Sequence, residues 1–452
     1  MAKPGDNINT FPVVPEVWLG DMVINLKRTN HQKFMDDRET LIEAYEGDNL
    51  RELTDKYFTS KDGKVQKSVP SAEGNLLDRA IRRMSLVYKD APDYGVEKWP
   101  NGYDPMKRWL FMKRAERIAN NIGTILLRPV VRNGEMDYDL IWNYFPFFDD
   151  DPLTPTGILY SVVTSNLNDL PEIDWIFWTK DLLVVFDSNF KVKRQPDNEK
   201  NVNKFGILPF ITVNVRQGQD YWNWGYGKPL LDANTAINVA LTEMRLGMRF
   251  SMMGQWVATG VIDDVTIKLG VDQVINLPEK ATLTAESPPA SMDEATTYIK
   301  TEYENAFQNI GLHITWGEKG GVPSGESLKV KNIELLERRE DALPVWLKAD
   351  SDLYEVERVV WEKSEGTKGK LQDREVNFAE VEFPVTPEQQ QARDEWDLEH
   401  GQTTEAEILW RNDPDGFKTL KEAEKKVTDN KVQSGQPTIV SGRSAFARAT
   451  QS

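Results

Sequence analysis

Cysteine is absent from the 452-residue chain. Its absence excludes disulfides, thiol nucleophiles and thiolate metal sites, and it fits assembly in a reducing cytoplasm. Histidine is scarce, and His31, His313 and His400 are each isolated in the sequence. Neither a G-x-S-x-G nor an H-E-x-x-H pattern occurs. The sequence therefore predicts a protein that is not an enzyme and that has no metal site and no cofactor.

Long apolar runs and net positive charge are also lacking. No run of about 18 apolar residues exists, so no segment is expected to span a bilayer. The opening stretch, MAKPGDNINTFPVVPEVW, lacks the apolar centre of a signal peptide. The formal net charge is −17. Because a protein that holds DNA by its phosphates needs the opposite sign, most of this surface should repel nucleic acid.

Tryptophan, in contrast, is abundant, with 14 residues. Tryptophan-rich surfaces bind sugars, but the rings more often fill cores and subunit contacts. The cluster DYWNWGYG, Asp220 to Gly227, is the best sugar-binding candidate, although its place directly before an apolar helix favours a packing corner. Carboxylate pairs are common in so acidic a chain, so a carbohydrate-binding or glycoside-cleaving β-domain protein stays open as the alternative.

The first half of the chain changes from helical to strand-like periodicity. Residues 1–30 carry three prolines and read as an extended arm. Apolar spacing predicts helices over 31–46, 75–91 and about 105–119. Residues 120–215 then alternate, with a tight-turn signal at Asn133-Gly134, which predicts an antiparallel meander. Three adjacent carboxylates, Asp149-Asp150-Asp151, lack the spacing of a calcium loop and indicate a solvated loop.

Two long helical patterns flank a short insertion in the second half. The first, 229–253, is apolar around most of its circumference, which is typical of a helix buried on several sides. The second opens on a capping box, Ser291 with Glu294, and ends at Gly311. A lone pair of such helices could not bury both apolar faces, so we expect identical neighbours on each side.

A third long helical pattern starts near Glu326 and contains Pro344, which predicts a kink. Acidic helices follow after Val381, and the stretch from Asn430 to the end of the sequence has the composition of a disordered tail. Between the second and third patterns lies GGVPSGES, Gly320 to Ser327, which nearly spells a phosphate-binding loop. Glu326 stands where that loop needs Lys, which reverses the sign of the interaction, and we expect no nucleotide binding.

The order of these parts resembles the portal proteins of tailed bacteriophages, the head-to-tail connectors. The phrases that carry the resemblance are YGKPLLDANTAINVAL, DQVINLPEKATLTAESPP, SMDEATTYIKTEYENAFQNIGL and WRNDPDGFKTLKEAEKKV, and it covers roughly residues 70–430. It implies an α+β fold in a multi-part subunit that assembles into a ring.

The resemblance also implies how the chain is divided. A β-rich wing is expected over 1–227, a kinked helix with a return to the wing over 326–385, and an α-helical crown over 386–430. The stem helices are expected at 228–251 and 291–312, the small β clip at 252–290, a tunnel loop at 313–325 and the disordered tail at 431–452.

Three sets of residues acquire roles by the same resemblance. The tunnel loop would approach passing DNA through His313, Glu318, Lys319, Val322, Ser324 and Glu326. The clip would receive its docking partners through Asp263, Asp264, Lys268 and Asp272. The stem would contact neighbouring subunits through Ile237, Leu241, Met244, Met248, Ile299, Tyr303, Ala306 and Ile310.

The implied partners follow from the family. Twelve copies would form a ring around double-stranded DNA, which would pass without sequence-specific contact. Terminase and then a head-tail adaptor would dock on the clip, and the major capsid and scaffolding proteins would surround the ring. The expected location is the virion, at one capsid vertex, after assembly in the bacterial host cytoplasm, with no membrane partner.

Overall fold

The computed structural model describes residues 30–59, 71–164, 172–195, 198–216, 218, 220–253, 255–259, 282–286, 292–312, 333–380, 387–412 and 419–434. The chain is a mixed α+β protein, as its sequence predicts. It divides into two compact units, Met1–Gly317 with Asn332–Val381, and Glu318–Lys331 with Glu382–Ser452. No helix in the described ranges is long and apolar enough to cross a membrane.

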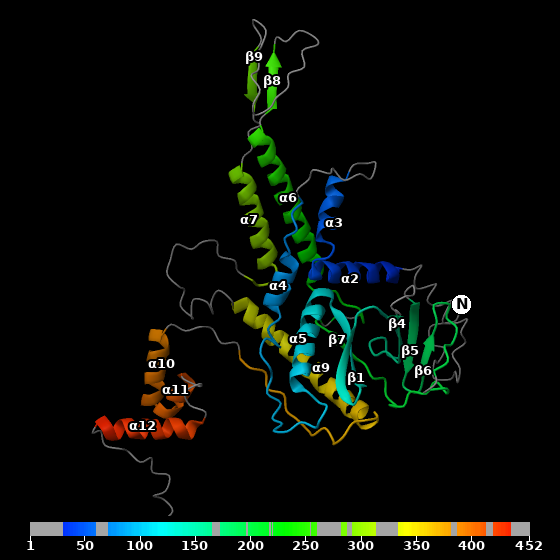
Figure 1. Cartoon of the computed structure of the whole chain (residues 1–452), viewed down its shortest axis with the longest axis vertical. Coiled ribbons are helices and arrows are strands. Elements are labelled where there is room, and N and C mark those ends of the chain that lie inside the picture. The colour runs from blue at the N-terminus through cyan, green and yellow to red at the C-terminus, as the bar shows by residue number, and fades with distance from the viewer. Residues whose placement is uncertain are drawn as a thin grey trace, which may run out of the picture. The chain divides into compact units, whose positions relative to one another are not determined.

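The first unit begins with a group of helices that packs on a sheet (Figure 1). These are α2 (Asn30–Glu46), α3 (Leu50–Asp55), the short 3-10 helix η2 (Lys56–Phe58), α4 (Leu76–Met84) and α5 (Pro105–Ile122). Their starts use ordinary caps: the Asp104 carboxylate accepts the Met106 N–H, and Pro105 fills the first turn of α5. Between α5 and β1 the backbone turns at Gly123, where φ is +95° and a Cβ would lie 1.9 Å from the Asn223 carbonyl oxygen.

Helix α4 is shorter than the sequence predicts. The apolar spacing over 75–91 is real, since Leu77, Ile81 and Tyr88 are all buried, but the helix ends at Met84. The backbone N–H groups of Val87 and Tyr88 donate instead to the carboxylate of Glu116 on α5, each at 2.9 Å. A side chain from another helix thus replaces the carbonyls that would have continued α4.

Two sheets replace the single meander that the sequence predicts. One has the order β2-β1-β7 and the other β3-β4-β5-β6, all antiparallel. Their strands are β1 (Thr124–Arg132), β2 (Glu135–Ile141), β3 (Tyr144–Phe147), β4 (Gly157–Thr164), β5 (Glu172–Thr179), β6 (Leu183–Phe186) and β7 (Ile211–Asn214). The predicted turn at Asn133-Gly134 is confirmed, with φ of +55° and +79°. The last strand pairs with β1 rather than with β6, which splits the meander.

Two long helices and a hairpin follow. They are α6 (Gly227–Met253), β8 (Gln255–Thr259), β9 (Thr282–Glu286) and α7 (Met292–Gln308), and β8 pairs with β9 in antiparallel register. Helix α9 (Ile333–Glu362) then crosses beneath the three-stranded sheet and stays helical through Pro344. Trp346, Leu353 and Val360 of α9 are fully buried against α5 and the sheets.

The second unit is helical where it is described. It contains α10 (Pro387–Glu399), α11 (Glu405–Asn412) and α12 (Leu420–Ser434), and α11 packs against α12. Arg411 on α11 forms an ion pair with Asp394 on α10. Three helices in this stretch were predicted from the sequence, but α12 ends at Ser434, so the predicted disordered tail over 431–452 is wrong for residues 431–434. Residues 435–452 of that tail lie outside the described residues.

Candidate functional site: the α6–α7 helix pair and its surroundings

The helix pair, α6 with α7, projects from the body of the first unit (Figure 1). At 27 residues, α6 is about 40 Å long, and the 17 residues of α7 span about 25 Å. The two helices pack side by side, and the β8–β9 hairpin lies between them in the sequence.

One apolar stripe of the pair is buried inside the chain itself. Ile237, Ile299, Ala306 and Ile310 are at most 8% exposed and belong to one core with residues of α4. Leu241, Met244 and Tyr303 pack partly buried against that core, whereas Met248 is 44% exposed. From the sequence all eight residues are expected at a subunit interface, but most of them lie in or against this core of the same chain, which also holds residues of α4. Of the eight, Met248 keeps the most open surface for a neighbour.

A row of polar side chains fixes α6 to the first residue of α4 and to the segment before it. The Asn234 side-chain oxygen accepts the Leu76 N–H at 2.6 Å, and Thr242 Oγ1 accepts the Ala72 N–H at 2.9 Å. Between them, Asn238 both accepts from and donates to the Gly74 backbone, each at 3.0 Å. In the sequence these residues seemed to interrupt an apolar surface. Their four-residue spacing was the available signal, since it places them on one face of the helix.

The ends of α6 and α7 next to the hairpin are exposed and oppositely charged. Tyr298 on α7 is 54% exposed, close to the exposed carboxylates Asp293 and Glu294 in the first turn. Arg245 and Arg249 are exposed near the last turn of α6. The pair therefore offers an acidic surface on α7 and a basic one on α6, with large apolar side chains among them.

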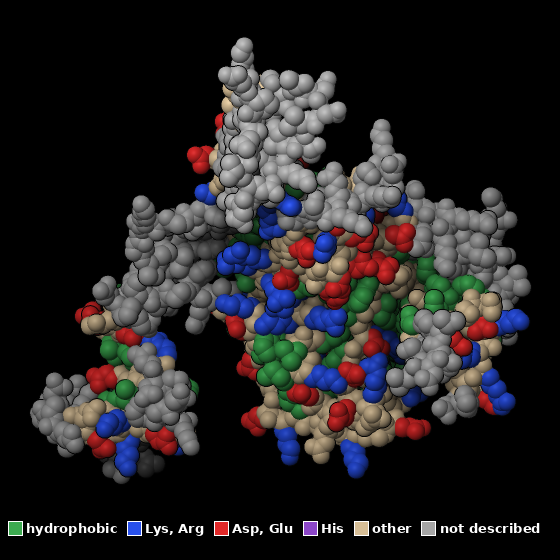
Figure 2. Space-filling view, turned by 45° about the horizontal axis from the view of Figure 1, so that its top comes forward, with side chains coloured by type: hydrophobic (Ala, Val, Ile, Leu, Met, Phe, Trp, Pro, Cys, Tyr) green, Lys and Arg blue, Asp and Glu red, His purple; other side chains and the backbone are tan. Residues whose placement is uncertain are grey.

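The body of the first unit also carries its basic and acidic residues on different helices. Helices α4 and α5 carry eight Lys and Arg against two Asp and Glu, a net of +6, whereas residues 30–59 carry four against eight, a net of −4. Figure 2 shows Lys and Arg gathered in one area of this face and Asp and Glu in another. We call the exposed Arg79, Arg82, Arg83 and Arg114 the basic patch, and the exposed Asp36, Glu39, Glu43, Glu46, Asp48 and Glu52 the acidic patch.

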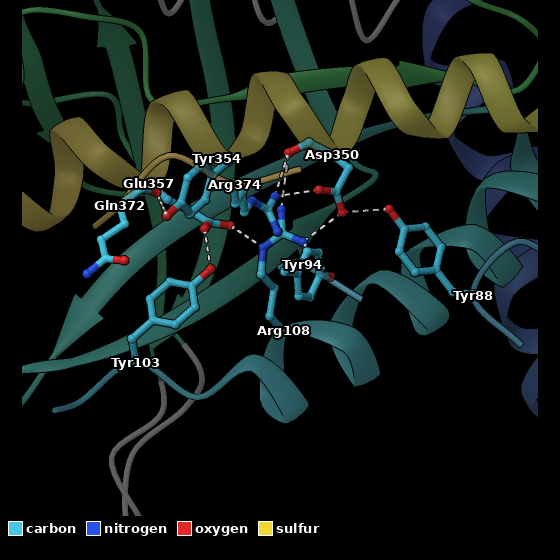
Figure 3. A network of polar contacts seen from close by, with 9 residues as sticks. All are labelled: Tyr88, Tyr94, Tyr103, Arg108, Asp350, Tyr354, Glu357, Gln372 and Arg374. Carbon is cyan, nitrogen blue, oxygen red and sulfur yellow. Dashed lines mark hydrogen bonds and ion pairs between the residues drawn. The ribbon is translucent and has the colours of Figure 1, made fainter. Parts of the chain in front are cut away.

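A buried ion network holds α9 on the body (Figure 3). The Arg108 guanidinium of α5 contacts Asp350 at 2.7 Å and Glu357 at 2.9 Å, and all three side chains are fully buried. Arg374 forms a second ion pair with Asp350. Hydroxyl groups complete the shell: Tyr88 donates to Asp350 at 2.8 Å, and Tyr103 donates to Glu357 at 2.6 Å.

The charges of this network balance, two guanidiniums against two carboxylates. Burial alone would raise the pKa of Asp350, but the guanidiniums of Arg108 and Arg374 outweigh it and hold that pKa below its ordinary value. Burial, and next the Glu357 carboxylate, raise the pKa of the Tyr103 hydroxyl well above its usual range. The network is therefore a fixed anchor for α9. Two carboxylates seven residues apart on an otherwise apolar helix face were the signal for it in the sequence.

The remaining predicted sites divide into described and undescribed ones. His313, Glu318, Lys319, Val322, Ser324 and Glu326 of the tunnel loop lie outside the described residues, as do Asp263, Asp264, Lys268 and Asp272 of the clip. The Asp220 to Gly227 cluster is a packing corner, because the Trp222 ring lies 5.3 Å from Phe34 and 4.8 Å from Tyr144. Across the described ranges, no group of His, Asp and Glu has the arrangement of a metal site.

No protein-family model matches the chain. No curated protein matches it either.

Proposed function

We propose that this chain is one subunit of a phage portal, a ring that serves as the channel for DNA packaging and ejection at one capsid vertex. Its partners would be identical copies, double-stranded DNA, terminase, a head-tail adaptor, and capsid and scaffolding proteins. The order of parts supports this reading: a mixed α+β body, two long helices around a β-hairpin, a long helix with an internal proline, and a separate helical unit.

The observation that carries the proposal is the separation of charge on one body. A ring forms when one patch of a subunit binds a different patch on the next, and such a head-to-tail contact needs two complementary surfaces. The basic patch on α4 and α5 and the acidic patch on α2 and α3 are two such surfaces. The basic end of α6 and the acidic end of α7 repeat the complementarity on the helix pair.

The overall charge fits a channel that does not retain DNA. Several Lys and Arg contacts to phosphate would produce strong, salt-sensitive binding, which would stop transport. A subunit with a net charge of −17 gives the assembled ring a repulsive field instead. Energy for movement would come from the terminase, because we assign no nucleotide site to this chain.

The proposal is tested by the size and symmetry of the purified full-length protein. Native mass spectrometry should find a closed ring near twelve times the 51.7 kDa subunit mass, and negative-stain images should show a central channel. A monomer or dimer at high concentration that binds glycans on an array would favour the carbohydrate-binding alternative. ATP turnover would contradict both readings.

A further inference from the structure

The three-stranded sheet has two edges of very different character. At the β2 edge, Asp137 and Asp139 form ion pairs with Arg132, and Lys107 pairs with Asp137 at 2.9 Å. Charged side chains of this kind discourage another strand from pairing. At the opposite edge, β7 reads Ile-Thr-Val-Asn and carries no charge. Alternate residues of an edge strand point their N–H and C=O groups away from the sheet, so β7 is the edge that still has room for a partner.

A groove runs along the β7 edge. It encloses about 710 Å³ and is lined by every residue of β7 together with Leu208 and Phe210 before it. Helix α9 forms one wall through Pro344, Val345, Lys348, Ala349 and Asp352. The loop of Leu153, Thr154 and Pro155 forms the other wall. An exposed strand edge that lies between two mostly apolar walls can bind an extended peptide, which adds to the sheet as a further strand by β-augmentation.

Two details indicate that the groove is built to be filled. The side-chain oxygen of Asn214, at the end of β7, is buried and has no hydrogen-bond partner. A buried acceptor without a donor is costly, and a backbone N–H in the groove would satisfy it. The loop wall is held in shape, since the Asp151 carboxylate accepts the Leu153 N–H at 2.9 Å and the Thr154 hydroxyl at 2.6 Å. Yet Leu153 itself is 48% exposed at the rim.

A segment that precedes α2 in the sequence has the composition of a suitable strand. Among residues 1–29, the stretch Asp21–Leu26, DMVINL, has neither proline nor glycine and alternates Met, Ile and Leu with Asp, Val and Asn. Helix α2 begins at Asn30, and Phe34 in its first turns packs on Trp222. The adjacent Tyr221 hydroxyl lies 3.2 Å from Thr212 Oγ1, which lines the groove. Three residues lie between Leu26 and Asn30, and the four Cα–Cα steps across them reach up to about 14 Å when extended.

We propose that Asp21–Leu26 lies in the groove of its own chain and pairs with β7 as a fourth strand of this sheet. The short connection favours the same chain over a second copy, because it keeps the local concentration of the segment high. The inference does not depend on the proposed ring, since it concerns one chain.

Cross-linking in the full-length chain tests this, and the lack of native cysteine leaves a clean background. Asn25→Cys would be combined with Thr154→Cys on the loop wall and treated with a short bismaleimide. The matched control combines Asn25→Cys with Glu135→Cys on the charged β2 edge. We expect an intramolecular cross-link, found as one linked peptide pair at monomer mass, in the first variant and not in the control.

A cross-link between different copies, equal cross-linking in both variants, or none in either would overturn the proposal. Hydrogen exchange gives an independent readout. Ile24→Pro removes a donor and breaks the strand, so exchange of the β7 amides that do not face β1 should become at least ten times faster. Thr10→Pro, outside the segment, should leave their exchange unchanged. Unaltered exchange in the Ile24→Pro variant would refute the pairing even if a ring forms, and a monomer with protected amides would refute only the ring.

Discussion

The charge separation on the body allows a direct test by reversal. Arg79 and Arg83 lie four residues apart on the exposed face of α4, and Glu39 and Glu46 lie seven apart on α2, so each pair shares one helix face. If these faces meet in neighbouring copies, Arg79→Glu with Arg83→Glu turns attraction into repulsion. An exposed ion pair contributes about 0.2–1 kcal/mol, and reversal adds a repulsion of similar size. The association free energy at each subunit contact should therefore become less favourable by about 2 kcal/mol, which is roughly 30-fold in affinity.

The assay is analytical ultracentrifugation at low and high salt. Either reversal alone, on α4 or as Glu39→Lys with Glu46→Lys on α2, should shift the assembly toward monomer at low salt, and salt should reduce the difference. The variant with all four changes should recover assembly, because the complementarity is restored with opposite signs. Lys180→Glu with Lys191→Glu is the control, since it changes the net charge as much as the α4 reversal, at exposed positions elsewhere. Failure of the fourfold variant to recover, with the control unaffected, would refute the contact between these faces.

Three further predictions concern stability, each measured by denaturant unfolding. Asp350→Asn removes the carboxylate between two buried guanidiniums and should lower the free energy of unfolding by about 3–5 kcal/mol. Asp352→Asn, on the exposed face of α9, should lower it by less than about 0.5 kcal/mol. Equal losses would mean that the network is not an anchor. Gly123→Ala forces a Cβ against the Asn223 carbonyl at positive φ and should destabilise the fold by more than about 2 kcal/mol. Gly247→Ala, with open space around it inside α6, should stabilise the fold by up to about 1 kcal/mol. A tolerated Gly123→Ala would contradict the close approach. Burial raises the pKa of Glu116 to about 7. Its contribution to stability is therefore complete below about pH 4.5 and is lost as the pH rises through 7, by up to about 3 kcal/mol. Glu116→Gln should flatten this dependence of unfolding free energy on pH, and an unchanged dependence would refute the assignment to Glu116.

Much of the secondary structure could be predicted from the sequence because local signals decide it. The Asn133-Gly134 turn, the start of α5 near residue 105, and both long helices around the insertion lie where the sequence places them. Periodicity could not show where α4 stops. The backbone N–H groups that follow the helix donate to the carboxylate of Glu116, which lies 32 residues beyond Met84 in the sequence. Nor could it show that β7 pairs with β1, a contact across about 90 residues of sequence.

The candidate site was harder to predict for the same reason. An apolar stripe on a helix indicates burial but does not name the surface that covers it. Ile237 and Ile310 were expected at a subunit contact, but both are buried in a core of their own chain that also holds residues of α4. The buried partners of Arg108 come from α9, more than 240 residues away, so no local pattern joined them.

Native mass spectrometry of the untagged full-length chain tests the central claim most directly. We expect a single closed assembly near twelve subunit masses of 51.7 kDa. A chain that stays monomeric across the whole concentration range, while its circular dichroism shows a folded α+β protein, would contradict it.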